Sequence, residues 1–110
     1  MGSTVDFVQY IIEQIDRPEQ VTARKMFGEY ALYYDGKVFA LVCDNQLFIK
    51  PTDAGRDFIG DTIDEAPPYP GARNHFLISD GIDKSEWVQK LADITAAALP
   101  LPKKKRRKTT

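Results

Sequence analysis

Few side chains in this sequence have the chemistry of a catalytic nucleophile or a metal ligand. His75 is the only histidine and Cys43 the only cysteine. One imidazole and one thiol are too few donors for a zinc site of this type. Cys43 lies inside an apolar run with no base beside it, so we expect a buried thiol and not an activated one. We expect His75 to be a structural or surface residue.

The acidic residues are numerous, but their positions have local explanations. Asp35 and Asp44 stand in turn dipeptides, and Asp53 and Asp83 stand where helices are expected to begin. Gly28 precedes a predicted strand, but the Gly-rich spacing and Lys-Ser/Thr pair of a phosphate loop are missing. The sequence therefore predicts no enzyme activity, no cofactor and no metal.

A run of basic residues is the clearest candidate for a binding function. It consists of Lys103, Lys104, Lys105, Arg106, Arg107 and Lys108 and carries a charge of +6, whereas residues 1–102 carry nine basic and 16 acidic side chains, a net charge of −7. Such a run attracts DNA or RNA by releasing counterions, but without aromatic residues it would not read bases. The alternative is a solubilising tail. We expect residues 103–110 to be disordered and residues 1–102 to form one domain.

Three short apolar runs form the centre of the predicted domain. They cover residues 29–34, 37–43 and 46–50, and the dipeptides Asp35-Gly36 and Asp44-Asn45 separate them. Both dipeptides suit two-residue hairpin turns, because their residues tolerate a positive φ. The pattern predicts an antiparallel meander of three strands.

The two turns also predict which side chains share a face of the sheet. Leu32 is expected opposite Phe39, and Tyr30 opposite Leu41. One face then carries Tyr30, Leu32, Phe39, Leu41 and Phe48. The other carries the uncharged set Ala31, Tyr33, Val38, Ala40, Val42, Leu47 and Ile49, which we assign to the core. We predict that the first face is an interface, most simply with a second copy in a twofold dimer; the alternative is that the last helix covers it.

Helical patterns flank the meander. The first runs from a cap at Ser3 to the residues before Pro18, the second from Thr52 or Asp53 to Ile59, and the third from Asp83 to Leu99 with Trp87 buried. Residues 17–25 and 61–73 are expected to be loops, and 75–79 a strand. The Pro-rich stretch 66–70 fits a rigid crossing or, alternatively, a ligand of SH3-type domains. The fold class is α+β, two-layered, in the order α-β-β-β-α-β-(β)-α.

The location of the protein follows from what its 110 residues lack. There is no apolar run of membrane-spanning length and no signal peptide at the N-terminus. With a single cysteine, these features predict a cytoplasmic protein that does not bind membranes.

Several motifs together resemble a known family. They are Lys25-Met26-Phe27-Gly28-Glu29-Tyr30, Leu32-Tyr33-Tyr34-Asp35-Gly36-Lys37, Phe39-Ala40-Leu41, Asp44-Asn45-Gln46-Leu47-Phe48-Ile49-Lys50 and the helix that carries Trp87. This series resembles the TfoX/Sxy N-terminal domain over about residues 5–99. The resemblance implies a small two-layer domain similar to type III secretion chaperones, a link to the control of competence genes, and no catalytic residues.

We therefore expect a non-enzymatic regulatory or protein-interaction module, a transcriptional co-regulator in the manner of TfoX. Its partner would be another protein or a second copy of the chain. The alternative is a nucleic-acid-associated protein that binds through its basic tail, and an uncharacterised enzyme is the third reading.

Overall fold

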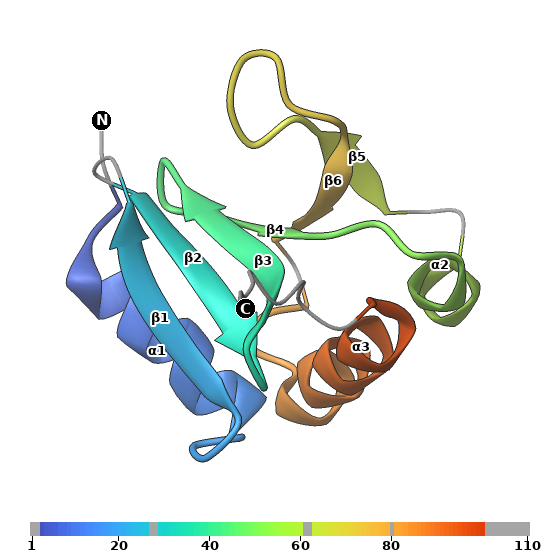
Figure 1. Ribbon diagram of the computed structural model, residues 1–110, viewed down its shortest axis with the longest axis horizontal. Coiled ribbons are helices and arrows are strands. Elements are labelled where there is room, and N and C mark those ends of the chain that lie inside the picture. Colours follow the sequence, from blue (N-terminus) through green and yellow to red (C-terminus); the bar gives the residue numbers. More distant parts are fainter. Residues whose placement is uncertain (1–2, 27–28, 61–62, 80, 101–110) are drawn as a thin grey trace, which may run out of the picture.

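The computed structural model describes residues 3–26, 29–60, 63–79 and 81–100. Its elements, in chain order, are α1 (Val5–Ile15), β1 (Val21–Met26), β2 (Glu29–Tyr34), β3 (Lys37–Cys43), β4 (Gln46–Ile49), α2 (Asp53–Ile59), β5 (Asp64–Ala66), β6 (His75–Ile78) and α3 (Ser85–Ala98). The strands form one antiparallel sheet in the order β1-β2-β3-β4-β6-β5 (Figure 1). The predicted α+β class is confirmed.

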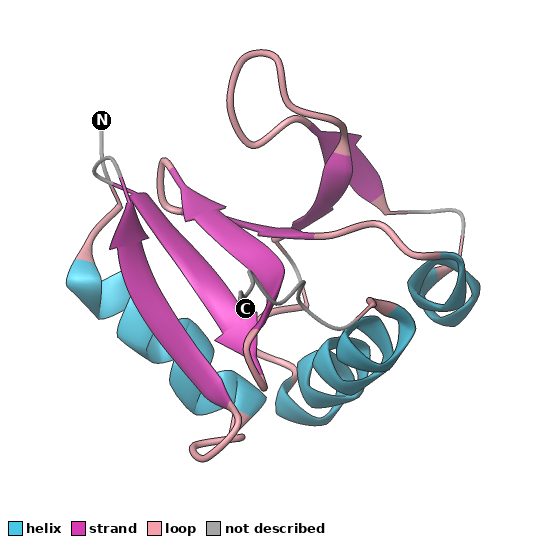
Figure 2. Cartoon of the chain, in the orientation of Figure 1, coloured by secondary structure: helices cyan, strands magenta, loops and turns pink. Residues whose placement is uncertain are grey.

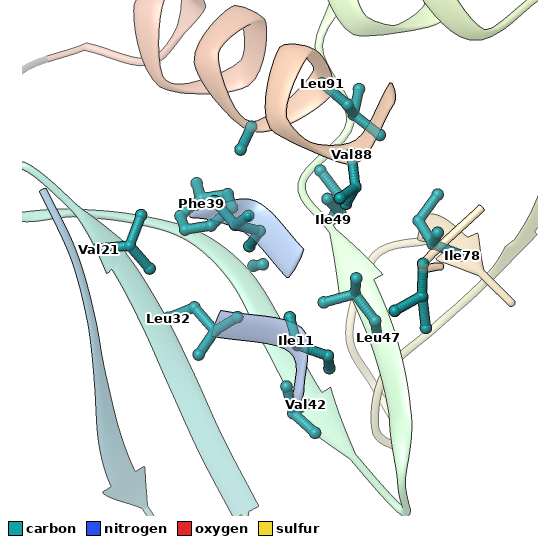
Figure 3. Packing of buried hydrophobic residues seen from close by; sticks show 14 of the residues in the cluster. Ile11, Val21, Leu32, Phe39, Val42, Leu47, Ile49, Ile78, Val88 and Leu91 are labelled. Atoms are coloured by element: carbon teal, nitrogen blue, oxygen red, sulfur yellow. The ribbon is translucent and has the colours of Figure 1, made fainter. Parts of the chain in front are cut away.

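The main core lies between the sheet and two helices. α1 lies behind β1 and β2, and α3 packs beside α1, with α2 next to α3 (Figure 2). Ile11 of α1 and Val88 of α3 are fully buried against sheet residues such as Ile49 (Figure 3). Burial of this apolar surface is the main favourable contribution to folding.

Two of the helices begin at threonine caps. The Thr4 hydroxyl accepts a hydrogen bond from the Phe7 amide at 3.2 Å, and the Thr52 hydroxyl accepts one from the Gly55 amide at 2.9 Å. The second cap was among those predicted, whereas the first lies one residue after Ser3. α3 begins at Ser85 without a side-chain cap, so the predicted cap at Asp83 is wrong.

The two hairpin turns are where the sequence placed them. Asp35 and Gly36 have φ angles of 51° and 82°, and Asp44 and Asn45 both have 55°. Two successive residues with positive φ are the mark of a type I′ turn. The register of the second hairpin is also confirmed, since Leu41 pairs with Phe48.

The predicted register of the first hairpin is correct next to the turn but wrong beyond Tyr33, because β3 contains a β-bulge. Tyr33 pairs with Val38, but Leu32 pairs with Ala40, so Phe39 is an extra residue without a partner in β2. An inserted residue changes the alternation of side chains beyond it. Phe39 therefore packs in the core on the same side as Leu32 (Figure 3).

Two strands were missed. β1 replaces most of the predicted loop 17–25, and β5 lies inside the predicted loop 61–73. Both are edge strands, and five of the six residues of β1 are exposed.

Trp87 was predicted to be buried, but it is only partly buried. Its ring stacks on the ring of Phe58, with a distance of 6.0 Å between the two ring centroids.

Among the described residues, no helix combines the length and the apolar character needed to cross a membrane. The predicted disordered tail, residues 103–110, lies outside the described part of the chain.

Candidate functional site

The sheet has a second apolar face, opposite α1 and α3. Leu47 and Ile49 point into the core, so Phe48 between them must point to this second face. Cross-strand pairing aligns Phe48 with one row of residues on that face. We call this side the outer face and define it by the four central members of the row, Ala31, Leu41, Phe48 and Leu77. Arg24 of β1 and Asp64 of β5 complete the row at the two edges of the sheet.

A cavity of about 440 Å³ lies against the outer face, below the connection between β5 and β6. It is lined by Met26, Glu29, Tyr30, Ala31, Leu41, Cys43, Pro68 and Tyr69. Pro68 is buried, whereas the side chain of Tyr69 is 55% exposed and that of Met26 is 41% exposed. The volume lies within the range of ligand sites, and it is large enough for a big apolar side chain.

Glu29 is the carboxylate of the cavity, and its hydrogen bonds are structural. One of its oxygens, Oε1, accepts hydrogen bonds from the Ser3 hydroxyl at 2.8 Å and from the Asp44 amide at 3.1 Å. The side-chain oxygen of Asn45 accepts a hydrogen bond from the Thr4 amide at 2.8 Å. These bonds tie the turn between β3 and β4 to the start of α1, so Glu29 stabilises one wall of the cavity.

Cys43 is the thiol of the cavity, and it is only 7% exposed. Burial raises the pKa of the thiol, and the negative charges of Glu29 and Asp44 raise it further. A raised pKa keeps the sulfur protonated at neutral pH, which is the opposite of what a nucleophile needs.

His75 lies outside the cavity, at the start of β6, and is 9% exposed. Its Nδ1 atom lies 3.0 Å from the carbonyl oxygen of Arg73. In the described ranges, no three His, Cys, Asp or Glu side chains come together as a metal would require.

The most strongly perturbed charges lie on the other side of the sheet. Arg17 donates two hydrogen bonds to the Asp93 carboxylate, at 2.8 and 3.1 Å, and the Tyr34 hydroxyl donates a third at 2.6 Å. The bond from Arg17 lowers the pKa of Asp93 most, and the bond from Tyr34 lowers it further. This cluster joins the α1–β1 connection and β2 to α3, so its role is to fasten the helix to the sheet.

The five predicted interface residues do not form one patch. Leu32 and Phe39 are fully buried in the core, whereas Tyr30 is partly buried against that core and also lines the cavity with Leu41. Leu41 and Phe48 lie on the outer face, where Phe48 is 3% exposed. The physical reason is the bulge at Phe39, which puts Leu32 and Phe39 on the opposite face of the sheet from Leu41 and Phe48.

Most residues of the cavity were not predicted from the sequence. Met26, Pro68 and Tyr69 were not among the predicted site residues, although they supply its rim. The Pro-rich stretch 66–70 was the available signal, because a rigid segment that crosses a sheet must cover something. The basic residues Lys103 to Lys108 lie outside the described residues, so the structure does not place them.

Two comparisons with known proteins bear on the identity of the chain. Residues 13–99 match the family model of the TfoX N-terminal domain. An uncharacterized 12.7 kDa protein encoded in the trpE 5′ region of Spirochaeta aurantia is 39% identical over 109 residues, which cover 99% of this chain and 94% of the relative.

Proposed function

Because the chain belongs to the TfoX N-terminal domain family, we propose that it is a non-enzymatic protein-interaction module that binds a partner on the outer face of its sheet. The observation that carries the proposal is the apolar cavity beside Leu41, with the exposed side chains of Met26 and Tyr69 at its rim. Exposed apolar residues gathered around a cavity are typical of binding sites.

The chemistry of the cavity favours binding over catalysis. The Glu29 carboxylate already accepts two hydrogen bonds from the protein, and the Cys43 thiol is held protonated. A nucleophilic thiol would have to be deprotonated, and the two hydrogen bonds to Oε1 of Glu29 hold that carboxylate in place as part of the cavity wall. We therefore assign the cavity to an apolar side chain of the partner.

The resemblance to TfoX suggests what kind of partner this is. TfoX is linked to the control of competence genes, which favours a partner among proteins that regulate transcription. On this proposal the chain acts as a co-regulator, and the outer face recognises the regulatory protein.

The test compares two tyrosines on different sides of the molecule. Tyr69 lines the cavity and is 55% exposed, whereas Tyr10 lies on α1 and is 38% exposed. Protein captured from a bacterial extract is quantified with wild type, Tyr69→Ala and Tyr10→Ala as baits. We expect the first substitution to reduce the capture of a specific partner and the second to leave it unchanged. Equal capture by all three would contradict the proposal.

A second pair of variants adds a charge instead of removing a ring. Leu41→Glu puts a carboxylate into the cavity, and Val5→Glu puts one on an exposed apolar residue of α1. A charge desolvated by a bound partner is costly, so we expect only Leu41→Glu to abolish binding. Unfolding of Leu41→Glu, checked by circular dichroism, would leave the tyrosine comparison as the deciding result.

A second candidate function is association with nucleic acid, which the charge distribution favours. The run Lys103 to Lys108 carries +6 beside a body of net charge −7. Binding through these side chains would weaken steeply with salt, with a logarithmic slope of about −0.9 for each phosphate neutralised. Replacing the six residues by glutamine should abolish binding to a DNA duplex. Salt-sensitive binding that survives this change would exclude the tail as its source.

A further inference from the structure

The sheet ends at β1 on one side and at β5 on the other, and the two edges differ. β1 has six residues, of which five are exposed, whereas β5 has three. No strand among the described residues lies beyond β1 (Figure 1). An edge of this length presents main-chain donors and acceptors that another extended segment can use.

The ladder between β1 and β2 shows which groups of β1 face outward. The Asp35 amide donates to the Gln20 carbonyl oxygen at 2.9 Å, which places these two residues at a hydrogen-bonded position of the ladder, although the Gln20 amide itself donates to the Arg17 carbonyl oxygen at 3.1 Å. Hydrogen-bonded and non-hydrogen-bonded pairs alternate along an antiparallel ladder. Thr22 and Arg24 therefore bond to β2, while the main-chain groups of the residues between and after them face away from it.

Those outward-facing residues are Ala23 and Lys25, which pair with Leu32 and Tyr30 without hydrogen bonds. Val21 also faces outward, but its amide donates to the Arg17 carbonyl oxygen at 2.8 Å. The edge thus offers the amide and carbonyl groups of both Ala23 and Lys25, spaced as an added strand requires.

We propose that β1 binds an extended, acidic segment of the partner protein by strand addition. This inference rests on the proposed function for its partner, and it adds a main-chain contact to the apolar contact in the cavity. Strand addition gains affinity from main-chain hydrogen bonds, and the side chains beside the edge select the sequence.

The charge of the edge identifies the kind of segment. β1 carries Arg24 and Lys25, both exposed, and no acidic residue. Arg24 and Lys25 are successive residues of the strand, so they lie on opposite faces of the sheet. A second copy paired with Arg24 opposite Arg24 would set like charges against each other, which is destabilising. An acidic segment would meet opposite charges instead. The basic charge that opposes self-pairing therefore favours an acidic partner.

The position of Met26 connects this edge to the cavity. It is the last residue of β1, and it also lines the cavity with Glu29 and Leu41. A segment that runs along β1 toward Met26 arrives at the rim of the cavity. One partner chain can thus occupy both sites.

The test uses defined peptides with the full-length chain. The probe is a blocked peptide of about eight residues that spans β1, with pairs of successive glutamates among valines so that carboxylates lie on both faces of the sheet. Ala23→Pro removes an outward amide without removing a bond to β2, a change that edge strands tolerate. Ala23→Val keeps the amide and is the matched control. We expect Ala23→Pro to weaken binding by about tenfold and Ala23→Val to leave it unchanged.

Two further measurements keep the result interpretable. The Lys25 amide of the wild type should become protected from hydrogen exchange when the glutamate peptide is added, which requires no variant to fold. A lysine–valine peptide should bind more weakly than the glutamate–valine peptide. Because the basic run 103–108 is present in every variant, a difference between Ala23→Pro and Ala23→Val reports on the edge alone.

Three outcomes would overturn the inference. Equal binding of the peptide to both Ala23 variants, with an unprotected Lys25 amide, would mean that the basic run alone holds the peptide. Stronger binding of the lysine peptide would contradict the assigned charge. A wild-type dimer that Ala23→Pro converts to a monomer would assign the edge to a second copy. None of these results depends on the cavity, so the proposed function is tested separately by Tyr69→Ala.

Discussion

Glu29 and Cys43 both line the cavity, but their interactions stabilise the structure and do not make either side chain reactive. Glu29 accepts hydrogen bonds from Ser3 and from the Asp44 amide, and its negative charge raises the pKa of the nearby thiol. The sequence predicted a buried, inactive thiol from its apolar neighbours alone, and the burial is confirmed. It did not show that Cys43 lines a cavity, because Pro68 and Tyr69 come from a distant part of the chain.

The first prediction concerns the reactivity of Cys43. Because its pKa is raised, the thiolate is scarce at neutral pH, and because the side chain is 7% exposed, reagents reach it slowly. We expect alkylation by iodoacetamide at pH 7 to be much slower in the native protein than after unfolding in urea. Equal rates in the two states would show that Cys43 is open to solvent.

The second prediction concerns Asp93 and the response to acid. Its pKa is lowered in the folded state, mainly by the bond from Arg17. A carboxylate of this kind adds stability above its unfolded pKa, near 3.9, and this contribution is lost as the pH falls through the lower folded pKa. Asp93→Asn should therefore lower the melting temperature at pH 7, and the difference from wild type should shrink toward pH 2.

A matched control for this measurement is Glu13→Gln on the exposed surface of α1. It removes a carboxylate that has no ion pair within the described residues. We expect it to change the melting temperature little at either pH. A difference between Asp93→Asn and wild type that stays constant with pH would contradict the assigned role of the ion pair.

At the scale of elements, the sequence predicted most of the sheet, because its turns carry distinctive residues. Asp35-Gly36 and Asp44-Asn45 tolerate the positive φ that their turns require, and both hairpins formed there. β1 was missed because Thr22, Arg24 and Lys25 are exposed, so the strand shows no run of apolar residues. An edge strand is held by pairing with its neighbour, which a single sequence does not display.

The bulge at Phe39 was missed for a different reason. One inserted residue leaves no mark in a run as apolar as β3, yet it decides which side chains share a face. The ring of Phe39 meets the ring of Tyr34 edge-on, with centroids 5.9 Å apart, on the side of the core. Because the predicted register was wrong by one residue, an aromatic side chain of the core was predicted to be an interface residue.

The third prediction follows from this position. Phe39 is fully buried, so Phe39→Ala should lower the free energy of unfolding by about 3–5 kcal/mol, measured by urea denaturation. Phe39→Glu should unfold the chain. The exposed Tyr69→Ala is the control and should change stability little. A folded, monomeric Phe39→Glu variant of a dimeric wild type would instead restore Phe39 to an interface.

On the scale of the whole molecule, the arrangement follows from the number of elements. α1 and α3 cover one face of the sheet, α2 packs beside α3, and the connection between β5 and β6 borders the outer face. The sequence correctly indicated that both faces are apolar. Since the helices cover one face, the second is left with a cavity whose rim side chains are exposed, which is the basis of the proposed binding function.

The central claim, that the outer face binds the partner, is tested most directly by methyl NMR of the full chain with the captured partner. We expect the signals of Met26, Ala31 and Leu41 at the cavity to shift, while that of Val5 on α1 stays in place. Shifts confined to α1 and α3, with the cavity methyl groups unchanged, would contradict the claim.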